Sequence, residues 1–394
     1  MKALASVVRW LVIIAALGAF VVEALGTLPA PTLPLLAIAV VVPELAPRSL
    51  VVCVALLLAV TSVARGRART PALGCAGLAC ALALVPLVEY PTTSASADAQ
   101  LRAVDGDRPA QAPLAVARAL VDVTNGVPVR TRDGATLALD VYRSPLRGPR
   151  PTVVTIYGGA WIFGTRADTA ELDRALAARG YTVIAIDYRH APRYHYPVQR
   201  EDVADALATI ARGAARWNVD PSRVALFGRS AGAELALLAA YEPGPLRIRA
   251  VVAYYAPTDL IDGYRTPPVP DPANVRRILR TYVGTPPEGR PDAYRDASPL
   301  AHVRTGLPPT LLVIGLRDAL VRPAQQRALR DSLRAHGDSV AAIEIPWSNH
   351  AFDALPGGLA GTLARRATDR FLAATLLTTQ PARRAARRAG PRRH

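Results

Sequence analysis

Apolar and polar positions divide the chain into two regions of different character. Apolar residues run almost without interruption through the first 90 positions, and the remainder has the mixed pattern of a globular protein. Residues 3–25 are long enough to cross about 30 Å of hydrocarbon as a helix, and residues 49–64 and 71–88 are further candidate spans. Residues 33–43 are apolar but short and bounded by prolines, so they predict a fourth, partial span or a re-entrant segment.

The same pattern predicts the order of the domains. A cleaved signal peptide would account for residues 1–25 but would leave the later spans unexplained. We therefore predict a transmembrane region of about three helices over residues 1–90. Residues 91–112 are small, polar and proline-containing, which predicts a linker. A globular domain is then expected over residues 113–378, followed by an arginine-rich tail at residues 379–394.

Arginine placement predicts the orientation of these spans. Arg65, Arg67 and Arg69 lie in the short loop between the last two strong spans, and loops rich in basic residues face the cytoplasm. Lys2 and Arg9 place the N-terminus on the same side. A fourth span would conflict with one of these basic clusters. We therefore expect a multi-pass protein of the cell membrane, with the globular domain outside the cytoplasm.

Beyond the linker, short apolar runs alternate with helical patterns. Strands are expected at residues 135–144, 151–157, 181–188, 223–228, 249–256, 309–315 and 341–346. Helical patterns, such as residues 167–180 and 200–217, lie between most of them. Continuous apolar strands that alternate with helices indicate an α/β fold, with a mostly parallel sheet covered on both faces. Ligands of such sheets bind at the carboxyl ends of the strands, so the turns there are candidate sites.

Composition and charge change this picture only slightly. The net charge is +16, but only Lys2 among the 47 basic residues is a lysine, and arginine is spread over the whole chain. We therefore predict no nucleic-acid partner. The arginine-rich tail fits a solvated segment or a contact with anionic lipid headgroups. Cys53, Cys75 and Cys80 all lie in the apolar region, where they imply neither a disulfide framework nor a metal site.

The turn after the expected strand 223–228 carries a nucleophile motif. GRSAG (residues 228–232) stands between that strand and a helical pattern, which is the context of a nucleophile elbow. The two glycines allow a strained turn that lifts the hydroxyl of Ser230 above the sheet. The turn also points it at the N-terminus of the next helix, where positive potential favours a developing oxyanion. The alternative is an ordinary serine in a glycine-rich turn.

A serine hydroxyl needs a base to take its proton, and the base needs an acid to orient it. Among the histidines outside the tail, only His350 follows every expected strand, so its loop can return to the serine. Asp318 directly follows the penultimate strand and is the candidate acid, with Asp259 after the preceding strand as the alternative. Ser230, Asp318 and His350 then appear in the chain order of α/β-hydrolases.

Four motifs together give the chain a family resemblance. They are YGGAW (157–161), DYRHAPRYHYPVQRED (187–202), GRSAG (228–232), and Asp318 with His350. Over roughly residues 125–375 the chain resembles the α/β-hydrolases, and within them the hormone-sensitive-lipase-like esterases and related carboxylesterases. The resemblance implies hydrolysis of carboxylic esters with short or medium acyl chains. It also implies that no metal or organic cofactor takes part.

The resemblance further implies an oxyanion hole made of backbone amides. Its expected donors are the N–H groups of Gly158, Gly159, Ala160 and Ala231. Ala160 replaces the third glycine of the family, but an alanine amide still donates a hydrogen bond. Tyr157 stands where the family often has histidine, at a position that orients the loop. Arg229 stands where the family often has aspartate, which indicates either contact with an anionic substrate or a surface position.

We therefore predict a membrane-anchored serine hydrolase that cleaves a small or lipid-like carboxylic ester through an acyl-enzyme. The same triad could act on amides or aryl formamides, and a non-catalytic binding protein with this fold is a third interpretation. Residues 257–298, rich in Pro, Arg and Tyr, are expected to form a small cap over the site. Asp187 and Arg189 are expected to form a structural pair, and Pro197 and Asp202 to fix the loop and helix that follow.

Overall fold

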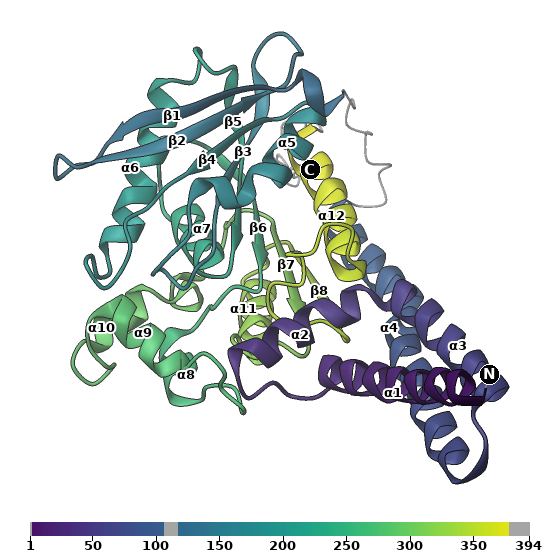
Figure 1. The fold of residues 1–394 in the computed structure, drawn as a ribbon. Helices are drawn as coiled ribbons and strands as arrows, with labels where there is room; N and C mark the ends of the chain where they lie inside the picture. Colours follow the sequence, from purple (N-terminus) through teal and green to yellow (C-terminus); the bar gives the residue numbers. More distant parts are fainter. Residues whose placement is uncertain (1, 106–116, 378–394) are drawn as a thin grey trace, which may run out of the picture.

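The computed structural model describes residues 2–105 and 117–377. The predicted tail at 379–394 and the end of the predicted linker at 106–112 lie outside the described residues. Figure 1 shows a large domain built on one sheet and, beside it, a projecting group of helices from the N-terminal third of the chain. We call residues 117–377 the sheet domain.

Three long helices form most of the projecting group. They are α1 (Lys2–Thr27), α3 (Ala46–Val63) and α4 (Arg69–Asp105), with a short 3₁₀ turn at Gly66–Ala68 between the last two. They contain the three apolar stretches expected to span a membrane, and each is long and apolar enough to do so. Large apolar side chains face outward on α1, and those of Leu11 and Ile14 are both 61% exposed. A contiguous surface of this kind fits a lipid environment better than water.

The fourth apolar stretch does not form a span. It forms α2 (Leu33–Glu44), whose 12 residues extend about 18 Å, well short of the hydrocarbon thickness. Leu36 and Ala39 are buried in a small cluster that residues 319–320 of the sheet domain complete. α2 therefore packs on the sheet domain, which corrects the expected fourth span or re-entrant segment.

The segment expected to be a linker is in part helical. Residues 91–105 form the last turns of α4, although their small, polar and proline-containing composition predicted an irregular segment. Contacts with the sheet domain stabilise this end of the helix. Ala97 and Leu101 are buried against the domain, and Asp98 accepts a hydrogen bond from Arg366 at 2.6 Å. Tertiary packing thus overrides local propensity, and α4 runs directly onto the sheet domain (Figure 1).

The sheet has eight strands in the order β1-β2-β4-β3-β5-β6-β7-β8. Their bounds are β1 Asp122–Arg130, β2 Thr136–Arg143, β3 Arg150–Ile156, β4 Thr182–Ile186, β5 Val219–Arg229, β6 Ile248–Tyr254, β7 Thr310–Gly315 and β8 Val340–Ile345. β2 is antiparallel to both of its neighbours, and the pairs from β4 to β8 are parallel. The mostly parallel sheet was predicted, and so were all strands except β1.

β1 was missed because its pattern is weak. It contains Gly126 and Pro128, which are uncommon in strands, and most of its side chains are exposed or half-buried. β1 lies at the edge of the sheet, so it pairs on one side only and tolerates a proline that lacks an N–H. A break in the register between Thr124 and Val127 further interrupts its alternation.

Helices cover both faces of the sheet, as the alternating pattern predicts (Figure 1). The helices of the sheet domain are α5 Ala170–Ala178, α6 Val198–Arg212, α7 Ala231–Tyr241, α8 Leu260–Arg265, α9 Val275–Val283, α10 Pro291–Asp296, α11 Pro323–Ala335 and α12 Leu359–Leu372. One hydrophobic cluster joins the strands to α6, α7 and α11, and a second joins them to α5, α12 and the end of α4. The carboxyl ends of β5, β7 and β8 therefore meet at one edge, where the candidate site lies.

Candidate active site

Ser230 occupies a strained turn between β5 and α7. Its φ is +51° and its ψ is −121°, a combination that L-residues rarely adopt. Glycine is required on both sides of the turn. A Cβ added at Gly228 would lie 2.2 Å from the carbonyl oxygen of Gly232, and one added at Gly232 would lie 2.2 Å from that of Tyr157. The turn therefore packs α7 closely against β3 and lifts the serine hydroxyl above the sheet.

His350 connects Ser230 to Asp318. Its Nε2 lies 3.0 Å from Ser230 Oγ, and its Nδ1 lies 2.8 Å from Asp318 Oδ2. The three residues stand in the turns that follow β5, β7 and β8. The structure thus brings together the three side chains that the sequence predicts as nucleophile, acid and base.

Backbone amides fix the carboxylate of Asp318 from its other side. Its Oδ1 accepts hydrogen bonds from the N–H groups of Leu320 and Val321, both at 2.8 Å. The Asp318 side chain is fully buried, and the His350 side chain is only 8% exposed. A carboxylate held in this way keeps the proton of the imidazole on Nδ1 and leaves Nε2 to accept the serine proton.

The alternative acid and another histidine have different partners. Asp259 caps α8, where its carboxylate accepts a hydrogen bond from the N–H of Asp262 at 2.9 Å. The Nε2 of His190 lies 2.9 Å from the hydroxyl of Tyr157, which supports the glycine loop. Asp318 and His350 are therefore the candidate acid and base that the geometry places in line with Ser230.

The glycine loop after β3 passes beside Ser230. An ideal Cβ on Gly158 would lie 3.3 Å from Ser230 Cβ, so bare backbone approaches the serine closely. Gly159, Ala160 and Trp161 have φ values of +122°, +54° and +61°, which turn the chain sharply off the strand. Within residues 117–377, no hydrogen-bond acceptor is paired with the N–H of Gly159 or Ala160. Both amides are therefore available to a ligand.

Ala231 provides a further amide on the other side of the serine. It is the first residue of α7, where the N–H groups of the first turn have no partner within the helix. The helix dipole adds positive potential at the same point. The four residues predicted to form an oxyanion hole thus lie on two segments that meet at Ser230.

A buried carboxyl supports the glycine loop. Glu234 of α7 is fully buried and accepts a hydrogen bond from Trp161 Nε1 at 3.0 Å. The Trp161 ring stacks on Tyr282 of α9, with ring centroids 4.1 Å apart, and the Tyr282 hydroxyl donates to Glu234 at 3.4 Å. Burial raises the pKa of Glu234 well above its usual range, which favours the protonated carboxyl.

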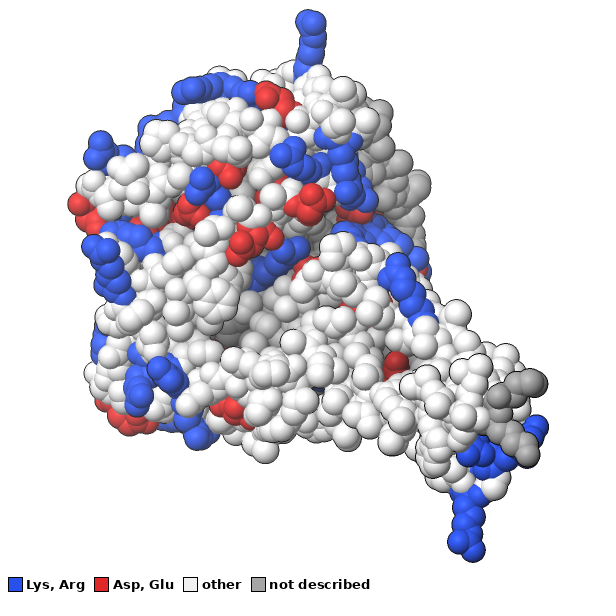
Figure 2. Space-filling view, viewed as in Figure 1, with Lys and Arg blue, Asp and Glu red and all other residues white. Residues whose placement is uncertain are grey.

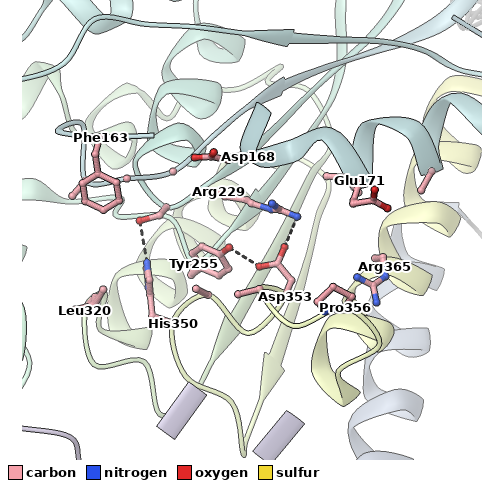
Figure 3. A pocket seen from close by; sticks show the side chains of 18 of the residues that line it. Phe163, Asp168, Glu171, Arg229, Tyr255, Leu320, His350, Asp353, Pro356 and Arg365 are labelled. Atoms are coloured by element: carbon pink, nitrogen blue, oxygen red, sulfur yellow. Dashed lines mark hydrogen bonds and ion pairs between the residues drawn. The ribbon is translucent and has the colours of Figure 1, made fainter. Parts of the chain in front are cut away.

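Arg229 is not a surface arginine, which corrects one of its two expected roles. Its side chain is 21% exposed, and its guanidinium lies 2.7 Å from the carboxylate of Asp353. The hydroxyl of Tyr255 donates to the same carboxylate at 2.6 Å, and the Tyr255 ring lies 4.5 Å from the ring of His350. Figure 3 shows Asp353 between Arg229 and Tyr255, with His350 on the far side of Tyr255. These contacts connect Arg229, the residue before Ser230, to His350.

Ser230 and His350 line a cavity of about 840 Å³. Its lining includes apolar and charged side chains, among them Phe163, Leu172, Leu320, Arg118, Glu171 and Arg365. A smaller apolar branch beside Ser230 is lined by Val275, Ile278 and Leu279 of α9. Residues 257–298 hold α8, α9 and α10, so the segment expected to form a cap does wall one side of the site. Figure 2 shows the sheet domain hollowed near the middle of the face in view.

The expected pair of Asp187 and Arg189 does not form. Arg166 contacts the carboxylate of Asp187 at 2.5 Å, and Arg189 contacts that of Asp202 at 2.7 Å. Both side chains are held in ion pairs, as a structural role requires, but each pairs with a residue elsewhere in the chain and not with the other.

Sequence reasoning missed three residues that support the triad: Asn349, Tyr255 and Asp353. The Asn349 side-chain oxygen accepts hydrogen bonds from the N–H groups of Ala319 at 3.0 Å and His350 at 2.8 Å, which joins the loops of the acid and the base. Tyr255 directly follows β6, and Asn349 and Asp353 lie in the loop that follows β8. That placement was visible in the sequence, but their pairing was not.

Comparison with known proteins agrees with this architecture. A family model described as BD-FAE matches residues 139–333. The probable carboxylic ester hydrolase LipM of Mycobacterium tuberculosis is 34% identical over 61% of this chain and 58% of its own length. Esterase LipC of the same organism is 33% identical over 59% of this chain and 61% of its own length. The chain thus spans about 60% of the length of these relatives.

A solved structure gives the same result for the fold. The structure of a bacterial heroin esterase superimposes with a TM-score of 0.59 at 25% sequence identity, covering 73% of this chain and 92% of the other. The strand order, the elbow at Ser230 and these similarities show that the chain has an α/β-hydrolase fold, similar to that of hormone-sensitive-lipase-like and carboxylesterase-type esterases.

Replacing Glu234 should change the pH dependence of stability. Folding raises the pKa of Glu234. The contribution of Glu234 to the free energy of unfolding is therefore complete below its ordinary pKa of about 4.3, and it is lost as the pH rises through the pKa that Glu234 has in the folded protein. Glu234→Gln mimics the protonated carboxyl. Thermal unfolding from about pH 5 to about pH 9 should show stability falling more steeply in the wild type, by up to about 1.4 kcal/mol per pH unit. The exposed Glu288→Gln variant serves as control, and equal slopes in all three proteins would contradict the assignment.

Replacing either partner of the Arg229–Asp353 ion pair should lower the free energy of unfolding. Because Asp353 is only 3% exposed, Arg229→Gln leaves a buried carboxylate without its cation, at a cost of about 3 kcal/mol in the free energy of unfolding. The double variant Arg229→Gln/Asp353→Asn should lose less than the sum of the two single variants. Urea unfolding measures all three, and strictly additive losses would mean that the two side chains are not coupled.

Proposed function

We propose that the protein is a serine hydrolase that cleaves carboxylic esters through an acyl-enzyme formed on Ser230. The observation that carries the proposal is the hydrogen-bonded series from Ser230 Oγ through His350 to Asp318. The names of the relatives support an ester as the substrate, and the adjoining cavity offers space for one.

In the first half of the reaction, Ser230 Oγ attacks the carbonyl carbon of the ester. His350 Nε2, at 3.0 Å, takes the hydroxyl proton as the new C–O bond forms. The carbonyl oxygen becomes an oxyanion, and the amides of Gly159, Ala160 and Ala231 are the donors that we assign to it. Such donors are each worth about 10²–10³ in rate, because they are already oriented toward the developing charge.

Collapse of the tetrahedral intermediate completes the transfer. The bond between the carbonyl carbon and the alcohol oxygen breaks, and His350 returns its proton to the leaving alcohol. Water then attacks the acyl-enzyme by the same relay and releases the acid. Asp318 stabilises the imidazolium in both halves of the reaction. Each step uses groups of the chain and water, so the proposal requires neither a metal nor an organic cofactor.

Ser230→Ala should abolish ester hydrolysis while the protein remains folded. The serine oxygen forms the covalent bond, so its loss should lower kcat for p-nitrophenyl esters by roughly 10⁴-fold or more. The measurement combines an acyl-chain-length series with labelling by a fluorophosphonate, which should modify the wild type at Ser230 and leave the variant unmodified.

Ser222→Ala is the matched control, since Ser222 is exposed at the start of β5 and should remain dispensable. Full activity of Ser230→Ala would contradict the proposal. Amides and aryl formamides belong in the same substrate series. A faster turnover of these compounds than of esters would keep the triad but replace the proposed substrate class.

We also propose that α1, α3 and α4 cross the cell membrane and hold the sheet domain outside the cytoplasm. An odd number of spans with the loop of Arg65, Arg67 and Arg69 in the cytoplasm gives this orientation. The space-filling view supports it, because the projecting helices carry few charges apart from a basic group at their far end (Figure 2).

Cysteine accessibility in intact cells tests this orientation. In a background with Cys53, Cys75 and Cys80 replaced by alanine, a membrane-impermeant maleimide should label Asp292→Cys in the sheet domain. It should label Thr70→Cys, beside the arginine loop, only after the cells are lysed. Both positions are exposed, so access depends on the side of the membrane. Labelling of Thr70→Cys alone in intact cells would reverse the proposed topology.

A further inference from the structure

The short helix α2 contacts the loop that carries the acid of the triad. Leu36 and Ala39 of α2 belong to a small apolar cluster against which Leu320 packs, and Leu320 also lines the cavity beside Ser230. The N–H of Leu320 also donates to Asp318 at 2.8 Å. A helix of the N-terminal region thus lies directly behind one of the loops that form the site.

The end of α2 reaches the loop of the base as well. Glu44 is 2% exposed. Its Oε1 accepts a hydrogen bond from the hydroxyl of Ser348 at 3.0 Å, and its Oε2 accepts from the N–H of Ala360 at 2.8 Å and of Gly361 at 3.4 Å. Ser348 stands two residues before His350, and Ala360 lies in the first turn of α12.

The position of this carboxyl in the sequence is informative. Glu44 is the only charged residue between Glu23 and Arg48, in a stretch that is otherwise apolar or proline-rich. Burying a carboxyl is unfavourable unless hydrogen bonds compensate, and all three donors to Glu44 come from the sheet domain. A segment that only anchored the protein in a bilayer would require no acidic side chain here.

We propose that α2 is part of the active-site scaffold and that Glu44 is a positioning residue for His350. The inference rests on the proposed function, because it assigns Glu44 to the reaction of the same triad. Glu44 acts through Ser348, whose loop it fixes against the N-terminus of α12. The imidazole is thereby kept in line between Ser230 and Asp318, and misplacement of such a group by about 1 Å typically lowers the rate about 100-fold.

The test compares full-length variants in detergent micelles. Glu44→Leu removes every acceptor, whereas Glu44→Gln keeps an oxygen for the amides of α12 and an NH₂ group that can donate to Ser348. Ser348→Ala removes only the link to the histidine loop. Val41→Ala, on the exposed side of α2, is the matched control. Fluorophosphonate titration counts the reactive serines in each preparation, so that kcat for p-nitrophenyl acetate is expressed per active site.

Glu44→Leu should lower kcat per active site by about 10- to 100-fold with KM nearly unchanged, because the base moves while the binding cavity remains. Ser348→Ala should lower it by about 3- to 10-fold, as expected for one lost hydrogen bond. Glu44→Gln should stay within about threefold of the wild type, and the Glu44→Leu/Ser348→Ala double variant should be no slower than Glu44→Leu.

A wild-type kcat per active site in Glu44→Leu would overturn the inference, since Glu44 would then serve stability alone. If Glu44→Leu does not fold, Ser348→Ala decides, and an unchanged kcat in that variant has the same meaning. Failure of the wild type to react at Ser230 would overturn the proposed function instead. The titration therefore separates the two failures.

Discussion

The architecture of the site depends on the strained backbone of Ser230. A positive φ at a non-glycine residue costs on the order of 1–3 kcal/mol and persists only where the surroundings leave no alternative. Here the surroundings are the close packing of α7 on β3 at Gly232, and a hydrogen bond from the N–H of Ser230 to Tyr254 at 3.0 Å. Because β3 and β6 flank β5, the same packing brings the glycine loop and Tyr255 to either side of the serine. The packing that imposes the strained backbone on Ser230 is therefore the same packing that brings the glycine loop and Tyr255 close to it.

Two buried polar arrangements hold the groups that converge there, and they differ in charge. Glu234 ties Trp161 and Tyr282 together as a carboxyl that burial keeps largely protonated, so this arrangement places little net charge under the glycine loop. Arg229 and Asp353 form an ion pair next to the base, where each charge offsets the desolvation of the other. Neither arrangement leaves an uncompensated negative charge beside Ser230, which suits the oxyanion that the proposed reaction would form there.

The sequence predicts those parts of the fold and the site whose signal is local. Parallel strands buried on both faces appear as continuous apolar runs, and each candidate of the triad stands directly after such a run. The edge strand β1 has no comparable pattern, since half of its surroundings are solvent. The partner of Arg229 could not be predicted from the sequence, because Asp353 lies 124 positions away and only the fold brings the two side chains together. The sequence did not predict the packing of α2 for another reason. Its residues are apolar on all sides of the helix, so the pattern cannot distinguish a helix that packs on the sheet domain from one that inserts into a membrane.

The attachment of the N-terminal region to α12 determines how the sheet domain is held. Near its N-terminus α12 is capped by Glu44, and further along its Arg366 pairs with Asp98 of α4 at 2.6 Å. A domain tied by one flexible linker could take up many orientations relative to its anchor, with an entropy that increases with linker length. Two contacts on the same helix, from segments 54 positions apart in the sequence, remove most of that freedom. The direction in which the cavity faces is then set by packing, so the N-terminal helices and the candidate site form one structural unit.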